Sequence, residues 1–145
     1  MKKLLSTNGT IAISVIRVML GIVLFAHGAQ KLLGWFGGYG YTGTMGFLTG
    51  AVHLPYIIGL LVIVIEFFGA LFLIAGFATR FAAAAIIILF TGIVYTSHWQ
   101  NGFFMNWGGD QKGEGFEYHL LVMAIAIALL INGGGRFSVD KAIAG

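Results

Sequence analysis

The chain has 145 residues, of which 59% are hydrophobic and only 9% are charged. A soluble domain carries charge on about a quarter of its residues, so this composition excludes an ordinary soluble protein. The absence of cysteine excludes disulfides, thiolate metal sites, cysteine-ligated iron–sulfur clusters and a cysteine nucleophile. The net charge of +3 is scattered along the chain and forms no basic cluster of the kind that binds nucleic acid, so no nucleic-acid partner is expected.

Four apolar segments are each long enough to cross a bilayer, which takes about 20 residues of helix. They cover residues 10–29, 55–77, 81–99 and 116–131. Each is continuously apolar and lacks the alternation of a membrane β-strand. The sequence therefore predicts an all-α membrane protein, a bundle of four transmembrane helices in which residues 1–145 form a single membrane domain. Two long loops, at about 28–54 and 100–115, join the helices at one side.

The basic residues predict the orientation of this bundle. One side receives Lys2, Lys3, Arg80, Arg136 and Lys141, and the other receives only Lys31 and Lys112. The positive-inside rule then places both termini in the cytoplasm, as expected for a multi-pass protein of the cell (inner) membrane. The many aromatic residues of the two loops are most simply an interfacial belt. Arg17 within the first apolar segment argues against a cleaved signal peptide, whose apolar region is normally uncharged.

Two charged residues, Arg17 and Glu66, fall deep within the predicted helices. A charge at such depth costs about 2.5 to 3.5 kcal/mol on insertion scales and normally faces the bundle interior beside a partner. The two residues are the only opposite charges available at depth, so each is the candidate partner of the other. A structural ion pair and a proton-handling or ligand-binding role both stay open. Arg17 has the alternative of extending toward the interface. Glu66 has no such alternative and is expected to be paired, protonated or used in proton transfer.

A second group of polar residues gathers near the outer ends of the predicted helices: His27, His53, His98, His119 and Glu117. Such a layer can bind a metal, ligate haem or hydrogen-bond a quinone. No two histidines have the spacing of a zinc site, so no metal site is predicted. His27 and His98 both end a G-I-V-x-x-x-H segment. This similarity leaves open a parallel duplication, with haem held between the two histidines, or chance. Glu117 and His119 are about 200° apart on a helix, and Glu117 is the preferred acid facing the pocket.

Several short motifs occur in a fixed order along nearly the whole chain. They are the early Arg17, HGAQKL at 27–32, EFFGA at 66–70, GFATR at 76–80, Glu117 at the start of the last helix, and GGGRFSVD at 133–140. In these the sequence resembles the DoxX family of small membrane proteins. The resemblance implies a four-span fold and, for some members, quinone-linked oxidation or responses to oxidative and quinone stress. The residues carried over by the resemblance are Arg17, Lys31, Glu66, Arg80 and Glu117.

Together these observations predict an integral membrane redox protein, or a subunit of an oxidoreductase complex, that binds a quinone-like or small aromatic ligand within the bundle. The cofactor is open between a quinone and haem. One alternative is a small transporter or proton-coupled pore built as a homo-oligomer. Another is a structural or assembly subunit of a larger membrane complex. The residues expected to carry the chemistry are Glu66, Glu117 and Arg17 as catalytic groups, and His27, His98, Lys31 and Trp99 as ligand-binding groups.

Overall fold

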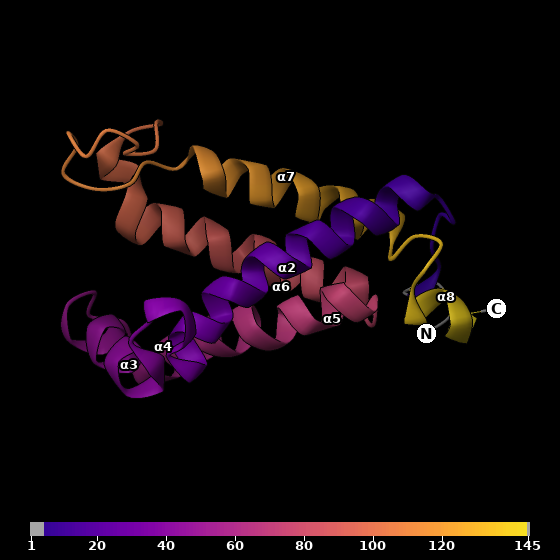
Figure 1. Cartoon of the computed structure of the whole chain (residues 1–145), viewed down its shortest axis with the longest axis horizontal. Coiled ribbons are helices and arrows are strands. Elements are labelled where there is room, and N and C mark those ends of the chain that lie inside the picture. Colours follow the sequence, from indigo (N-terminus) through magenta and orange to yellow (C-terminus); the bar gives the residue numbers. More distant parts are fainter. Residues whose placement is uncertain (1–4, 145) are drawn as a thin grey trace.

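The computed structural model describes residues 5–144, and within that range every regular element is helical (Figure 1). Three helices are long and apolar enough to cross a membrane, namely Ile11–Leu33, Tyr56–Ala75 and Thr79–Asn101. The elements are α2 (Ile11–Leu33), η1 (Trp35–Gly37), α3 (Gly40–Gly50), α4 (Tyr56–Val64), η2 (Ile65–Gly69), α5 (Ala70–Ala75), α6 (Thr79–Ile93), η3 (Val94–His98), η4 (Trp99–Asn101), α7 (Glu117–Asn132) and α8 (Val139–Ala144). The prediction of an all-α membrane protein is confirmed.

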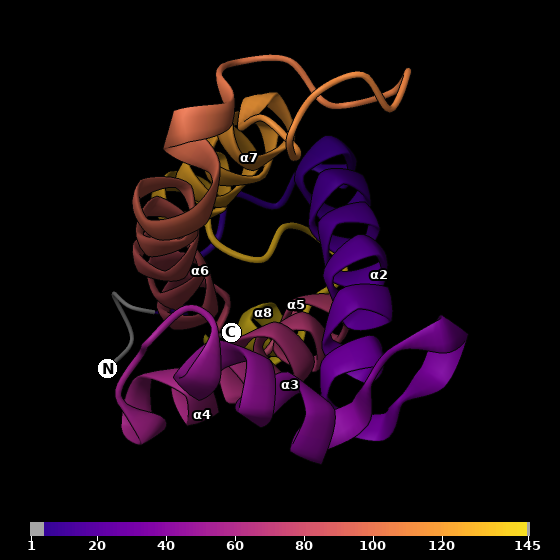
Figure 2. The same ribbon diagram turned by 90° about the vertical axis from the view of Figure 1, so that its left-hand side faces the viewer.

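The elements form an elongated bundle with two distinct ends (Figure 1). α4, η2 and α5 make one continuous helix, and α6, η3 and η4 make another. α2 packs against α5 and η2, and α6 packs against α7. Seen along the bundle, α2, α7, α6 and the α4–α5 helix surround the centre (Figure 2). We call the end that carries α3 and residues 102–116 the loop end, and the opposite end the α8 end.

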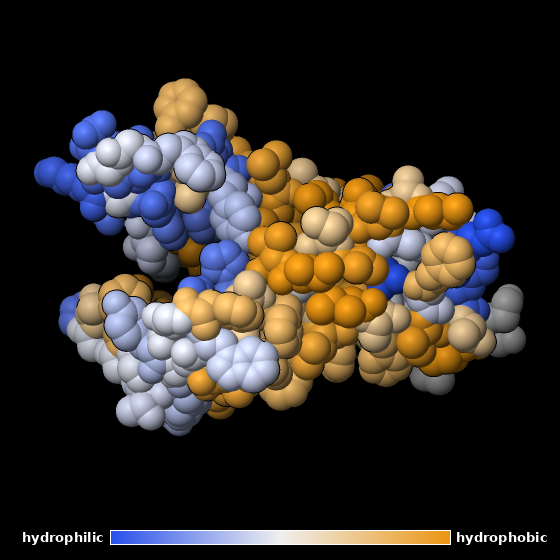
Figure 3. Space-filling model, viewed as in Figure 1, coloured by the Kyte–Doolittle hydropathy of each residue, from blue (hydrophilic) through white to orange (hydrophobic). Residues whose placement is uncertain are grey.

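The surface of the bundle is that of a membrane protein. Apolar residues cover its middle, whereas hydrophilic residues concentrate at the two ends (Figure 3). Large apolar side chains along the helices point outward, among them Val15, Met19, Ile57, Leu61, Ile88 and Leu121. The 23 residues of α2 give a length of about 34 Å at 1.5 Å per residue, enough for the hydrocarbon core. At the loop end, exposed Trp35, Phe36, Tyr39 and Trp107 occupy the place predicted for an aromatic belt.

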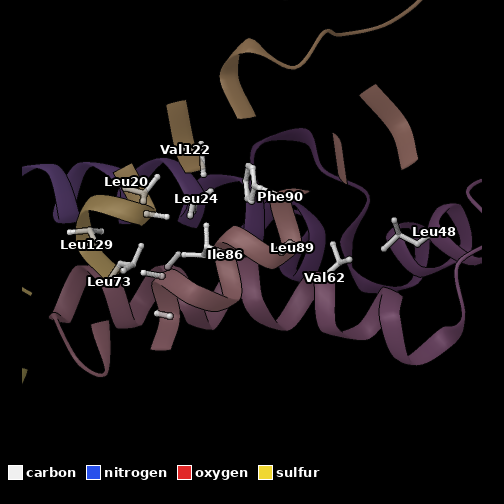
Figure 4. Packing of buried hydrophobic residues seen from close by; sticks show 14 residues of the cluster. Leu20, Leu24, Leu48, Val62, Leu73, Ile86, Leu89, Phe90, Val122 and Leu129 are labelled. Carbon is white, nitrogen blue, oxygen red and sulfur yellow. The ribbon is translucent and has the colours of Figure 1, made fainter. Parts of the chain in front are cut away.

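Small and aliphatic side chains fill the centre of the bundle (Figure 4). Leu24, Leu73 and Ile86 come from three different helices and are fully buried. Gly28 brings α2 onto η2, because a Cβ at this position would lie 2.6 Å from the Cα of Phe67. Such backbone contact is how small residues join membrane helices.

Arg17 joins three segments of the chain by hydrogen bonds at the α8 end. Its side chain is buried, with a relative exposure of 1%. Nε donates a hydrogen bond to the carbonyl of Gly134 at 2.8 Å, and Nη1 donates to the carbonyls of Leu73 and of Ile74, the latter at 2.8 Å. Nη2 donates to the carbonyl of Phe137 at 2.5 Å. The guanidinium thus joins α2, the end of α5 and the segment that leads into α8.

Asp140 completes this junction. Its two carboxylate oxygens accept hydrogen bonds from the backbone N–H groups of Ala78 and Thr79 at 2.7 and 2.8 Å, at the start of α6. Asp140 also interacts electrostatically with Arg17. The candidate pair of Arg17 with Glu66 is therefore not formed, because Arg17 donates to backbone carbonyls at the α8 end while Glu66 lies toward the loop end.

The long loop predicted at 28–54 is also partly wrong. α2 continues to Leu33, where Gly34 ends it with a left-handed φ of 74°. α3 then forms over Gly40–Gly50 although its glycines and threonines are weak helix formers. It buries Met45 and Leu48 and packs against α2 and α4, so tertiary contacts override its low propensity. Lys2 and Lys3, which contributed to the predicted orientation, lie outside the described residues.

Candidate functional site

A cavity of about 510 Å³ opens at the loop end, within the range of about 300 to 1,000 Å³ that is usual for ligand sites. Figure 3 shows its entrance as a notch between the part of the surface over α3 and the part over residues 102–116. Apolar side chains make up much of its wall, including Phe47, Leu48, Val52, Leu54, Val62, Phe90, Ile93 and Met105. The polar and ionisable residues on the wall are His27, Lys31, Glu66, Thr96, Ser97, His98, Asn101, Glu114, Tyr118 and His119.

An ion pair between Lys31 and Glu66 lies in this wall. Lys31 Nζ donates a hydrogen bond to Glu66 Oε2 at 2.6 Å, and the side chains are 28% and 3% exposed, respectively. Glu66 belongs to η2, a π-helical turn in which one extra residue changes the direction of the following side chains. The partner of Glu66 is thus Lys31, at the end of α2, and not Arg17. The pair explains how a carboxylate is kept inside an apolar bundle.

The second π-helical turn, η3, supplies another polar part of the wall. Thr96, Ser97 and His98 belong to it and line the cavity. Nδ1 of His98 lies 2.8 Å from the carbonyl oxygen of Glu114. A carbonyl can only accept, so Nδ1 carries the proton, and Nε2 of the neutral ring is left as an acceptor. Asn101 Nδ2 donates to the same carbonyl at 3.0 Å, which fixes the segment that orients His98.

The first turn of α7 adds Tyr118 and His119. The rings of His119 and His98 lie 4.2 Å apart, and those of Tyr118 and His27 lie 5.9 Å apart. Within residues 5–144, the hydroxyl of Tyr118 and Nδ1 of His119 are buried and have no hydrogen-bond partner. A buried polar group without a partner costs about 1 to 3 kcal/mol. These two groups therefore suit a ligand that brings hydrogen-bonding oxygen atoms.

The cavity brings together four of the residues that the sequence predicts for the site: Glu66, Lys31, His27 and His98. Glu66 and His98 both lie in π-helical turns, which are frequent at functional sites. No feature of the sequence indicated that helix geometry. Among residues 5–144, no three His, Asp or Glu side chains converge as they would around a metal ion.

Three predicted site residues do not line the cavity. Arg17 holds the α8 end, as described above. Glu117 Oε1 accepts a hydrogen bond from the backbone N–H of Met105 at 2.9 Å, so it fastens the loop that precedes α7. Trp99 is exposed and stacks on Phe116, with ring centroids 5.5 Å apart and planes 10° from parallel.

The orientation of the first turn of α7 also differs from the sequence expectation. Glu117 was the acid preferred for the pocket, yet His119 lines it. α7 begins at Glu117, so this carboxylate turns back toward the N–H groups of the loop, where the positive helix end favours it. His53, which the sequence placed in the same histidine layer, is exposed between α3 and α4. Tyr118 was not predicted, because an apolar-face tyrosine gives no distinct signal of a ligand site.

Comparison with known proteins assigns the family. Residues 12–99 match the DoxX family model, which covers α2 through η3, including Lys31, Glu66 and His98. The chain belongs to the DoxX family. It is also similar to a protein of Bacillus subtilis (strain 168) named "Putative oxidoreductase CatD", with 29% identity over 123 residues, covering 85% of this chain and 79% of the relative. No solved structure matches.

Proposed function

We propose that this DoxX protein is a membrane redox protein or a component of a membrane oxidoreductase whose loop-end cavity binds a quinone-like or other small aromatic ligand. The observation that carries the proposal is the cavity of about 510 Å³, in which an apolar wall holds the Lys31–Glu66 ion pair and three histidines. The name of the B. subtilis relative, which describes an oxidoreductase, supports a redox role. Membership of the DoxX family is consistent with it.

The residues of the wall suit a ring that carries oxygen atoms. Phe90 and its aliphatic neighbours contact the faces of the ring, and Lys31, Tyr118 and His119 provide hydrogen-bond donors. His98 Nε2 provides an acceptor for a ligand hydroxyl. Interconversion of a quinone and a hydroquinone transfers two electrons and two protons. In this proposal the wall residues exchange the protons, and a separate redox partner, either a protein or a small reductant, exchanges the electrons.

The proposal includes the topology of the chain. α7 has 16 residues and is apolar, and we propose that it is the fourth span of a single membrane domain covering residues 1–145. Among the described residues, Arg80, Arg136 and Lys141 lie toward the α8 end, and Lys31 and Lys112 lie toward the loop end. The positive-inside rule then places both termini in the cytoplasm and the cavity mouth on the outer side of the inner membrane. Homo-oligomers and protein partners are compatible with this arrangement.

The direct test is calorimetric binding of 2,3-dimethoxy-5-methyl-1,4-benzoquinone to the protein in lipid nanodiscs. Saturable binding with one site per chain is expected. Glu66→Gln is expected to weaken it at least tenfold, equivalent to about 1.4 kcal/mol, because the variant releases Lys31 from its partner and alters the polar wall. Asp110→Asn removes the same charge from an exposed loop and serves as the matched control. Absence of binding to the wild type, or equal affinity of Glu66→Gln, would contradict the proposal.

An absorption spectrum separates the quinone from the haem interpretation. Protein purified in mild detergent, air-oxidised and then reduced with dithionite, is expected to be colourless above 350 nm. A Soret band with sharp reduced peaks would instead show haem, with His27 and His98 as the first ligands to replace. Both histidines line the cavity, and haem ligation by them stays a prediction that this spectrum decides.

A further inference from the structure

The cavity opens at the loop end of the bundle (Figure 3). Some of its lining residues come from two segments outside the long helices. Phe47 belongs to α3 and Val52 follows it, and Met105 and Gly113 belong to the loop before α7. These two segments lie on opposite sides of the notch in Figure 3 and on opposite sides of the bundle centre in Figure 2.

The opposite side of the cavity is closed by an apolar layer to which α2, α5, α6 and α7 contribute. On α2 and α7, apolar residues separate the polar residues of the cavity from the α8 end. On α2, Leu20 and Leu24 lie between Arg17 and His27, and on α7 the apolar residues from Val122 to Leu129 follow His119. The layer consists of Leu20, Leu24, Ala70, Leu73, Ala82, Ala83, Ile86, Val122, Ala126 and Leu129, each at most 3% exposed (Figure 4).

The buried polar side chains lie on one side or the other of this apolar layer. Among the described residues, Ser14, Arg17, Thr79 and Asp140 lie on the α8 side, and Thr44, Glu66 and His119 lie on the loop side. The guanidinium N–H groups of Arg17 donate to backbone carbonyls at the α8 end. No described polar side chain bridges the layer, so water or protons have no polar path from the cavity to the α8 end.

From this we infer that the cavity is a blind pocket entered from the water at the loop end, and that its ligand is a small aromatic molecule without a lipid tail. This inference rests on the proposed function and names its ligand class. A polyprenyl chain attached to a ring in the cavity would meet the closed apolar layer at the inner end. At the mouth it would pass between surfaces where hydrophilic residues concentrate (Figure 3). Neither route stabilises the chain, because burial of apolar surface, not its exposure, contributes free energy. The blind end also argues against a pore.

The first experiment measures access, and it uses the absence of cysteine in the chain. Val52→Cys places one thiol on the cavity wall near the mouth. Gly46→Cys marks the loop end, since no atom lies within 4 Å of a Cβ there, and Ala142→Cys marks α8, where the residue is exposed. Each variant is treated with a membrane-impermeant maleimide in spheroplasts and in inverted vesicles.

Val52→Cys is expected to react in the preparation that labels Gly46→Cys and to remain unlabelled in the preparation that labels Ala142→Cys. Reaction of Val52→Cys from the α8 side would overturn the blind pocket. Failure to react from either side, while both markers react, would overturn entry from water. Neither result depends on any ligand, so the access claim is tested separately from the proposed function.

The second experiment tests the ligand class by protection of the same thiol. The ligands are three hydroquinones with the same ring, one without a tail, one with a ten-carbon tail and one with a long isoprenoid tail. Hydroquinones are used because a quinone would itself add to the thiol. The tail-less compound is expected to slow labelling of Val52→Cys at least fivefold and to leave Gly46→Cys unaffected. Protection by a long-tailed compound at a tenfold lower concentration would overturn the tail-less class while supporting aromatic binding. Protection by none of them, with labelling intact, would refute aromatic binding and leave water entry standing.

Discussion

Removing Lys31 is expected to destabilise the protein more than removing its partner Glu66, although the two share one contact of 2.6 Å. The reason is their unequal exposure, 28% for the Lys31 side chain and 3% for that of Glu66. Lys31→Met leaves a carboxylate unpaired inside the bundle, which costs about 3 to 5 kcal/mol. Glu66→Gln leaves an ammonium group that can turn into the cavity, so the loss is nearer that of one charged hydrogen bond, about 1.5 to 3 kcal/mol.

The double variant Lys31→Met/Glu66→Gln is expected to recover most of the loss, because replacing both partners of a buried pair is often close to neutral. Unfolding in mixed micelles, followed by circular dichroism as a function of denaturant, gives all four free energies of the cycle. Lys112→Met at an exposed position is the control and is expected to change stability by less than about 0.5 kcal/mol. Equal, additive losses of under about 1 kcal/mol for the two single variants would show a weak surface pair and contradict a buried, mutually stabilising one.

Three further substitutions separate structural from functional roles. Arg17→Gln is expected to lower the unfolding free energy by more than about 3 kcal/mol, since charged hydrogen bonds to carbonyls are lost. Its ligand affinity, measured by calorimetry at low temperature, is expected to stay within threefold of the wild type. A loss of affinity without a loss of stability would contradict this structural role. Gly28→Ala is expected to cost about 1 to 3 kcal/mol through overpacking against Phe67, whereas Gly92→Ala, with open space around it, is expected to change thermal stability little. Glu117→Gln is expected to leave ligand affinity within threefold, and an effect as large as that of Glu66→Gln would restore its predicted catalytic role.

The apolar segments were predictable because membrane helices must satisfy their backbone internally and bury apolar faces, so their signal is local. The last three predicted segments agree with the structure to within about a turn of helix. α3 was missed because its helical state depends on packing of Met45 and Leu48 against other helices. A segment with four glycines among its 11 residues gives no local signal of such packing.

The sequence predicted several residues of the candidate site, but not which of them contact one another. The positions of Arg17 and Glu66 within the predicted helices correctly indicated that both are buried. Their opposite charges, however, suggested each as the partner of the other. That inference considered only charged partners. A guanidinium can instead donate to backbone carbonyls, as Arg17 does to Gly134, which is 117 residues away in the sequence. Lys31 reaches Glu66 through the close approach of α2 to η2, and that approach is a property of the assembled bundle.

Photoaffinity labelling gives a direct test of whether a small aromatic ligand binds in the loop-end cavity. A tail-less azidobenzoquinone, irradiated with the protein in nanodiscs and located by mass spectrometry, is expected to label peptides that contain the cavity residues of α2, η3 and the first turn of α7. An excess of the unmodified tail-less benzoquinone is expected to suppress that labelling. Labelling confined to the outer apolar faces of the helices, or insensitive to competition, would contradict ligand binding in the cavity.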